Sequence, residues 1–377
     1  MKRLTACALV LLCCVPLSGC WDYRGLDEID IVTGVAVDKN TSGLYQLTIE
    51  IVDTRCSAKE GDLSAKYVEA EGETIFNAIR NSKKRLINKL YGGNMQTLVI
   101  SRQIAETEGV SVILEELLRD GEPRETMSVV ISQEKTAKDI LLAEGIDSKI
   151  ISYEIHDMVE EDNRVTAATV SMPLYKAYNA IKGTGNSLTL PAVHCVQNGN
   201  KTVVESNGIA LFEGDKLIGF LPGKNSIYYL FFRNELKGGV ISFPVSRPDD
   251  SVSMEIKGCK TNVDISVQDG RAYVTLFIDI NLNVMEIKSQ LSISQTSERK
   301  ALEQQTATFL KTSIANFFKD VQTQNKIDIF GFGRQLYQKT PDLWESIEDD
   351  WNELFQDAVI QVKVNAKIQS AGVLKDY

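Results

Sequence analysis

The chain has 377 residues, of which 43% are hydrophobic and 24% are charged, and these are the proportions of an ordinary folded protein. Its formal net charge of −10 argues against a nucleic-acid-binding protein, because such proteins present a basic surface. The same acidic balance does not favour broad contact with anionic lipid. The length allows two or three domains.

The first twenty residues have the pattern of a bacterial lipoprotein leader. Lys2 and Arg3 precede an uncharged apolar run over residues 4–16, which is shorter than the about 20 residues that a membrane-spanning helix needs. The run gives way to "LSGC", which resembles the lipobox whose cysteine receives a diacylglycerol and becomes the first residue after cleavage. We therefore predict a signal peptide over residues 1–19 and lipid attachment at Cys20. An ordinary secretory signal followed by a chance cysteine is the alternative.

An N-terminal α/β domain is predicted over residues 20–199. "IDIVTGVAVDK" and "LYQLTIEIVD" have strand character and are joined by the turn residues "NTSG", which predicts a hairpin. Strands are also predicted at residues 96–101 and 127–132, with helical stretches between and after them. The segment 74–90 has helical periodicity. Its basic side chains are either a solvated face or contacts for lipid headgroups or an acidic partner, and they include Arg80, Lys83, Lys84 and Arg85.

Between residues 156 and 250 the sequence contains an acidic stretch, a predicted linker and a predicted small domain. The acidic stretch "HDMVEEDN" at residues 156–163 is interpreted as a solvated loop rather than a metal site, because it lacks the glycine of hard-cation loops. Residues 183–200 are rich in Gly, Asn, Ser and Thr and predict a linker. A small middle domain is predicted over residues 200–250, with a hairpin in "GIALFEGDKLIGFL".

The most regular pattern lies in residues 251–377, which are predicted to form an α+β domain with an antiparallel sheet and helices on one face. Two strands flank the turn signal Asp269-Gly270. Apolar residues between 302 and 321 mark one face of a long helix, and a second helix is predicted over 342–355. "VIQVKVNAKI" alternates strictly, as in a strand with one wet side. The whole chain is therefore predicted to be α+β, a three-domain ectodomain with largely antiparallel sheets flanked by helices.

No catalytic motif stands out in this sequence. The two histidines, His156 and His194, lack a local context that suggests a nucleophile pair, and the common phosphate, dinucleotide and zinc motifs are absent. Beyond the leader and the anchor, Cys56, Cys195 and Cys259 are an odd number without metal-ligand spacing, so they are small buried residues or include one disulfide. We predict no catalytic residue, no metal and no cofactor, and therefore no enzyme.

Several stretches together resemble the Ger(x)C family, the C-subunit lipoproteins of bacterial spore germinant receptors. They are the lipobox cysteine followed by Trp-Asp, "EAEGETIFNAIR" (69–80), "LLRDGEPRETMSVVIS" (117–132), "GIALFEGDKLIGFL" (208–221) and "DIFGFGRQLYQKTPDLWESIEDDWNELF" (328–355). Their order and spacing extend over nearly the whole chain after the leader. In the last stretch, the aromatic residues Phe330, Phe332 and Tyr337 are candidate partner contacts, although core packing is the simpler interpretation.

The resemblance implies a three-domain α/β protein without known catalysis, lipid-anchored to the outer face of the inner spore membrane. There it would act with a multipass A-type subunit and a transporter-like B-type subunit to sense nutrients and trigger germination. Our own hypothesis is that it couples these subunits by binding them and not by turning over a substrate. Two other classes stay open at this point. A solute-binding lipoprotein of a transporter would need two similar doubly wound lobes. A membrane-anchored hydrolase would need a nucleophile and a base that converge in a pocket.

Overall fold

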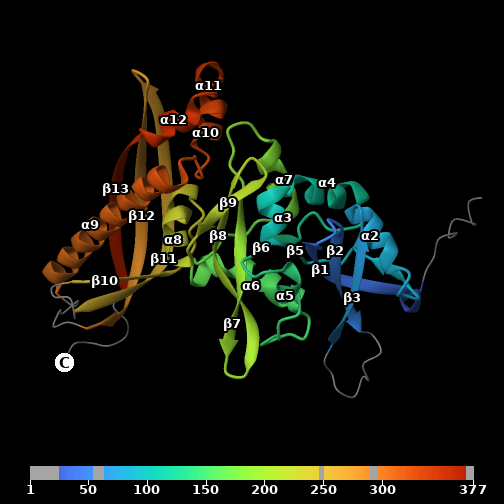
Figure 1. Cartoon of the computed structure of the whole chain (residues 1–377). Coiled ribbons are helices and arrows are strands. Elements are labelled where there is room, and N and C mark those ends of the chain that lie inside the picture. Colours follow the sequence, from blue (N-terminus) through green and yellow to red (C-terminus); the bar gives the residue numbers. More distant parts are fainter. Residues whose placement is uncertain (1–24, 54–62, 246–249, 289–294, 371–377) are drawn as a thin grey trace, which may run out of the picture.

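The computed structural model describes residues 25–53, 63–245, 250–288 and 295–370. Within these residues the strands form two sheets, and helices pack on their faces, so that the fold is α+β as predicted. Figure 1 shows the sheet of the first half at one end of the molecule and the sheet of the last third at the other. Cys20 and Cys56 lie outside the described residues.

The first sheet has the strand order β3-β2-β1-β5-β6-β7-β8-β9, and β4 pairs with the start of β1. The strand bounds are β1 Ile29–Lys39, β2 Tyr45–Asp53, β3 Ser64–Gly72, β4 Lys89–Tyr91, β5 Thr97–Ile100, β6 Ser128–Ser132, β7 Thr189–Asn198, β8 Lys201–Glu213 and β9 Lys216–Leu221. Strands β1, β5, β6 and β7 run parallel in the centre, and antiparallel strands extend the sheet on both sides. The central β5 and β6 are short and fully buried, as parallel strands covered on both faces must be.

Helices cover both faces of this sheet. Their bounds, with a short 3-10 turn η2 at Leu26–Glu28, are α2 Ile75–Ser82, α3 Arg102–Thr107, α4 Ser111–Asp120, α5 Ala137–Leu141, α6 Ile151–Val165 and α7 Leu174–Lys182. Strand alternation assigns the two faces. Leu98 and Ile100 of β5 share a core with α2, α3, α4 and α7, whereas Val99 between them packs with α5 and α6. The sheet is therefore the middle of three layers.

The second sheet has the order β10-β11-β12-β13 and one helix-covered face. Its strands are β10 Val240–Pro244, β11 Ser251–Gln268, β12 Arg271–Ile287 and β13 Val359–Ser370. The helices are α8 Gly223–Arg233, α9 Thr296–Asp320, a π-helical turn η3 at Val321–Asn325, α10 Phe332–Lys339, α11 Pro341–Ile347 and α12 Trp351–Gln356. The face predicted for the long helix α9 is confirmed, because Leu302, Leu310 and Ile314 are all buried against the sheet.

One prediction about this sheet is wrong. The sheet was expected to be antiparallel, but β13 pairs in parallel with β12, with Tyr273 opposite Val359 at one end and Leu282 opposite Ile368 further along. Helices α9 to α12 carry the chain back across the sheet before β13 begins. Strict alternation reports which face of a strand is wet and does not report its direction. The alternation in "VIQVKVNAKI" could therefore not distinguish the two pairings.

Three local predictions in the first half also need correction. The helix predicted over residues 74–90 ends at Ser82, because Lys89–Tyr91 forms β4 and pairs with the first residues of β1. The acidic stretch 156–163 is part of α6 and not a loop, since Ile151, Ile155 and Val159 are buried at helical spacing. The expected linker 183–200 contains β7, whose apolar start is buried between β6 and β8.

The segment 200–250, predicted as a middle domain, is shared between the two halves. Strands β8 and β9 extend the first sheet, whereas α8 contributes Tyr229, Leu230, Phe231 and Phe232 to the core of the second. The described residues of this segment therefore have no separate core. The second C-terminal helix, predicted over 342–355, is divided into α11 and α12 by a turn.

Candidate functional site

The basic residues predicted as partner contacts lie at the end of α2 and on the turn that follows it. Thr74 caps this helix by accepting a hydrogen bond from the backbone N–H of Asn77 at 3.1 Å. In the last turn of the helix, the Arg80 guanidinium lies 4.7 Å from the ring centre of Phe76. Residues 83–88 then lead the chain back to the sheet, where β4 begins at Lys89.

Hydrogen bonds from side chains to the backbone hold this turn. The Lys83 ammonium donates to the carbonyl oxygens of Ile87 and Asn88. The Arg85 guanidinium donates to the carbonyl oxygen of Glu69 on β3. The predicted cations thus gather on one short segment, with exposed side chains, although they do not lie on a single helix.

Beneath α2 lies a cavity of about 460 Å³, bounded by α2, α4 and one face of the first sheet. Its wall is apolar and includes Val35, Leu47, Ile49, Ile75, Leu98 and Ile113. The volume lies within the range of small-molecule sites. The sequence does not reveal this cavity, because its wall is assembled from strands and helices that only the tertiary fold brings together.

The mouth of the cavity carries both signs of charge. The lining residues that are exposed to solvent are Arg80, Lys83, Lys89 and Asp120, which places the opening between the end of α2, β4 and the end of α4. Lys89 is paired with Glu122 at 3.1 Å, and Glu122 also accepts a hydrogen bond from the backbone N–H of Gly92. With the described residues, Arg80 and Lys83 form no ion pair.

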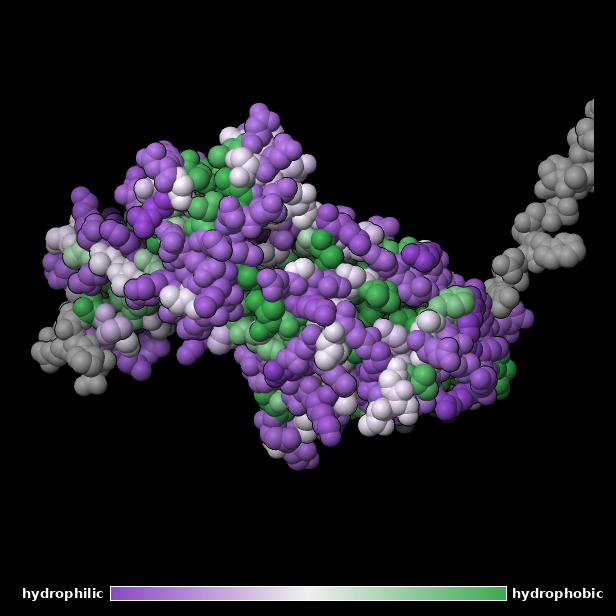
Figure 2. All heavy atoms as spheres, turned by 45° about the horizontal axis from the view of Figure 1, so that its top comes forward, coloured by the Kyte–Doolittle hydropathy of each residue, from purple (hydrophilic) through white to green (hydrophobic). Residues whose placement is uncertain are grey.

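Large apolar side chains are exposed around the same segment. Ile87 on the turn is 92% exposed, and Phe76 on α2 and Tyr91 on β4 are exposed by 45% and 40%. On the face of the molecule in Figure 2, polar residues predominate and apolar ones form small groups. Ile87 is thus an exposed apolar side chain on the same turn as the cations Lys83, Lys84 and Arg85.

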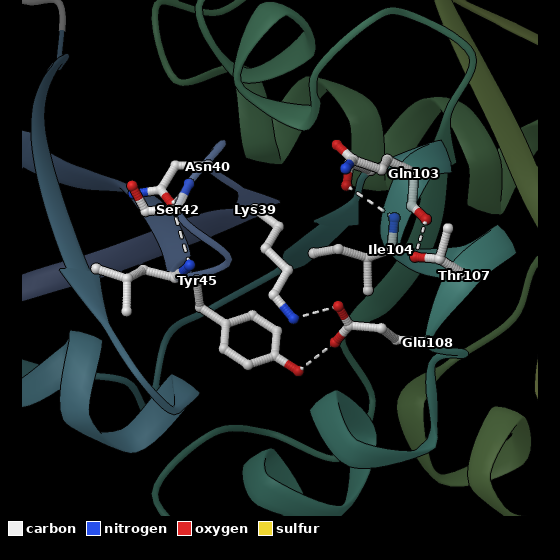
Figure 3. Close-up of polar contacts among 10 residues, drawn as sticks. Lys39, Asn40, Ser42, Tyr45, Gln103, Ile104, Thr107 and Glu108 are labelled. Carbon is white, nitrogen blue, oxygen red and sulfur yellow. Dashed lines mark hydrogen bonds and ion pairs between the residues drawn. The ribbon is translucent and has the colours of Figure 1, made fainter.

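A polar cluster ties the hairpin of β1 and β2 to the end of α3 (Figure 3). The Glu108 carboxylate accepts hydrogen bonds from the Lys39 ammonium and, at 2.9 Å, from the Tyr45 hydroxyl. Burial, together with the neighbouring carboxylate, raises the pKa of Tyr45 to about 12. Burial acts to raise the pKa of Glu108, but the two donors outweigh it and lower that pKa below its usual value. This cluster stabilises the fold and leaves no group free for chemistry.

The fully buried Glu50 has an equally structural role. It accepts hydrogen bonds from the backbone N–H groups of Ile151 and Ser152, at 2.8 and 3.1 Å, and so caps the start of α6. The hydroxyls of Thr33 and Tyr67 also donate to it, at 2.7 and 3.2 Å. These donors are polar groups of the fold that need a hydrogen-bond acceptor when they are buried, and Glu50 is that acceptor.

The hydrolase alternative requires an accessible nucleophile beside a base. His156 Nδ1 lies 2.8 Å from the hydroxyl oxygen of Ser128, which is the one such contact of this histidine in the described residues. Ser128 is completely buried at the start of β6, so that a substrate cannot reach its hydroxyl. The other histidine, His194, contacts Glu205 at 3.4 Å on a strand surface. Neither histidine forms a pair that resembles a hydrolase site.

The candidate aromatic residues of "DIFGFG" divide into buried and exposed ones. Phe330 and Phe332 are 1% and 0% exposed, so the candidate partner contacts at these two residues are wrong and the simpler interpretation, core packing, is confirmed. The reason is the buried Asp328, whose carboxylate accepts backbone hydrogen bonds at 2.9 to 3.0 Å from residues 330, 331 and 333 and folds the loop inward. Trp351 donates to the same carboxylate at 3.2 Å. Of the three candidates, Tyr337 is exposed, by 46%.

The described cysteines, Cys195 and Cys259, are both free and half-buried. Burial raises the pKa of each thiol to about 11, so that neither is an activated nucleophile. Among the described residues, no group of three or more His, Cys, Asp and Glu side chains could hold a metal ion. No helix within this part of the chain is long and apolar enough to cross a membrane.

Comparison with known proteins identifies the class to which this fold belongs. The family described as "Spore germination protein N-terminal domain" matches residues 22–195, and "Spore germination B3/ GerAC like, C-terminal" matches residues 207–372. The two matches together cover nearly the whole chain. The protein therefore belongs to the Ger(x)C family of spore germination proteins.

Individual relatives are similar over their full length. "Spore germination protein KC" of Bacillus subtilis is 23% identical, over 99% of this chain and 97% of that protein. "Spore germination protein A3" of the same organism is 24% identical, over 96% of each. The crystal structure of the GerBC protein superposes with a TM-score of 0.59 at 16% identity, covering 89% of this chain and 97% of that one, and so shares the fold.

Proposed function

We propose that this protein is a lipid-anchored accessory subunit of a spore nutrient germinant receptor. It would be attached through Cys20 to the outer face of the inner spore membrane and would bind the A-type and B-type integral membrane subunits. It would couple nutrient sensing to germination by these contacts and not by turnover of a substrate. The observation that carries the proposal is the match of both family regions, in order, along nearly the whole chain.

The placement of the exposed basic and apolar residues supports a role beside a membrane. Strand β4 pairs with the first three residues of β1, so that the turn after α2 lies close to where the described chain begins. Only eight residues separate Ile29 from Cys20. A lipid on Cys20 would therefore keep this end of the molecule near the bilayer, and β10–β13 at the remote end would reach outward (Figure 1).

The two alternative classes have less support. A solute-binding protein with two similar doubly wound lobes is not what the described residues form, since one sheet is mixed with strands in the order β3-β2-β1-β5-β6-β7-β8-β9 and the other has four strands. A hydrolase lacks support because Ser128, the serine in contact with a histidine, is buried.

The proposal is tested in spores that lack this chain. We expect them to lose germination in response to the nutrients of one receptor, while germination triggered by agents that bypass the receptors is unchanged. An affinity tag on the chain should recover the A-type and B-type subunits from detergent-solubilised spore membranes. Normal nutrient responses in the deletion spores, with no membrane subunit recovered by the tag, would contradict the proposal.

A further inference from the structure

We infer that the cavity beneath α2 binds one acyl chain of an anionic membrane lipid, with the lipid headgroup held at the cationic mouth. This goes beyond the proposed function, which needs only the anchor and the partner subunits. It rests on the proposed function in one respect, because the membrane location supplies the lipid. Binding itself is a property of the isolated protein and is tested separately.

The interior of the cavity fits a hydrocarbon chain. Its wall is continuous with the apolar core between the sheet, α2 and α4, and its volume is about 460 Å³. Ser82 is the one buried polar residue among the described lining residues, and its hydroxyl already donates to the carbonyl oxygen of Ile79 at 2.6 Å. An apolar cavity without free polar groups favours an apolar occupant over water. A sugar or another small polar nutrient would find no partners inside.

The mouth fits an anionic headgroup. Arg80 and Lys83 line it and form no ion pair with the described residues, so that no described carboxylate neutralises their charges. Lys83 also donates to the carbonyl oxygens of Ile87 and Asn88, which fix its ammonium at the turn without removing its charge. Lys89 and Glu122 neutralise each other there at 3.1 Å. Asp120 is the remaining carboxylate, and against the two charges of Arg80 and Lys83 it leaves the mouth positive. Phosphate and carboxylate oxygens are the groups that guanidinium and ammonium bind best.

The position of the mouth explains why the ligand is a lipid of the bilayer. The strand β4 forms one side of the opening and pairs with the start of β1, which only eight residues separate from Cys20. Ile87, 92% exposed on the adjacent turn, is placed to enter the interface beside the headgroups. A lipid that leaves the bilayer by one chain would therefore meet the cavity without crossing water over a long distance.

The test uses the mature lipidated protein in vesicles of phosphatidylcholine that contain a trace of a photoreactive lipid. One probe is phosphatidylglycerol with a diazirine midway along one acyl chain, and the other is phosphatidylcholine with the same chain. After irradiation, peptide mass spectrometry locates the adducts. We expect the phosphatidylglycerol probe to label cavity residues such as Ile79, Met95 and Leu117 several-fold more than the phosphatidylcholine probe does.

Two sets of variants separate the interior from the mouth. Ile79→Trp should fill the cavity and abolish these adducts, whereas Ile181→Trp, in the same core on α7 but outside the cavity, should not. Arg80→Gln with Lys83→Gln should lower labelling by the anionic probe by about fivefold for each charge removed. Lys216→Gln with Lys224→Gln removes the same charge from exposed sites elsewhere and is the matched control.

Three results would overturn the inference. The first is equal labelling by the two probes, and the second is the absence of adducts within the cavity. The third is cavity labelling that occurs only after Cys20→Ala, since the protein's own anchor would then be the occupant. Circular dichroism of each variant shows whether it is folded. If Ile79→Trp is not folded, the exposed Arg80 and Lys83 variants decide the question alone.

Discussion

The substitution Phe330→Ala distinguishes a recognition site from a packing site at the "DIFGFG" loop. Phe330 is 1% exposed and lies where α8, α9 and the C-terminal helices meet. If the loop were a docking surface, loss of the ring would reduce partner binding and leave the fold stable. If the ring is a core element, its loss should destabilise the fold before any partner is present.

The structure sets the magnitude of this effect. Among the described residues, six aromatic rings have centroids within 6.2 Å of that of Phe330, and the nearest, Phe232, is stacked at 4.1 Å. Replacing a buried phenylalanine by alanine costs about 3–5 kcal/mol, and aromatic pairs add to the cost of lost area. With so many ring contacts and a loop fixed by Asp328, we expect the upper half of that range, about 4–5 kcal/mol.

Urea unfolding followed by tryptophan fluorescence measures this loss. Trp344 and Trp351 pack together at 5.7 Å and report on the same region. Tyr337→Ala, on exposed α10 surface in the same motif, is the control and should change the free energy of unfolding by less than about 1 kcal/mol. A loss below about 1 kcal/mol for Phe330→Ala would refute the packing argument.

Three further predictions follow from buried or partly buried polar groups. Glu50→Gln removes acceptors from the start of α6 and should cost about 2–4 kcal/mol in urea unfolding, whereas the exposed Glu73→Gln should be near neutral. The lowered pKa of Glu108 contributes stability above the unfolded-state pKa of about 4.3, so the difference between the wild type and Glu108→Gln in unfolding free energy should vanish as the pH falls through the folded pKa. A difference that persists at low pH would contradict this. Cys195 and Cys259, with pKa values raised to about 11, should react with iodoacetamide at pH 8 far more slowly than free cysteine, as peptide mass spectrometry will show.

The spacing of apolar residues in the sequence predicted the helices and strands that bury one face and expose the other. The buried residues of α9 and the alternation of β13 follow directly from spacing in the chain. The acidic residues of α6 concealed a helix, because they cover its exposed face while Ile155 and Val159 are buried beneath. The direction of β13 depends on how α9 to α12 cross the sheet, which no spacing within the strand encodes.

In the candidate site, too, some features follow from the local sequence and others only from the tertiary fold. The cations Arg80, Lys83, Lys84 and Arg85 were identifiable from composition alone, but the turn that gathers them exists because β4 pairs with β1 across about 60 residues of chain. The cavity is a property of the assembled layers and has no local signal. Phe330 and Phe332 attract attention in the sequence because they are aromatic and each lies beside a glycine. Their burial follows from Asp328, whose hydrogen bonds turn the loop inward.

The most direct test of the central claim is the replacement Cys20→Ala in spores in which this chain is the sole copy of its subunit. Membrane fractions, recovery of the A-type and B-type subunits by a tag, and nutrient-triggered germination are scored together. We expect the protein to leave the membrane fraction and the spores to lose the response to nutrient. If the variant stays on the membrane with its partners and germination is normal, protein contacts alone hold the subunit in place and the proposed lipid anchor is dispensable.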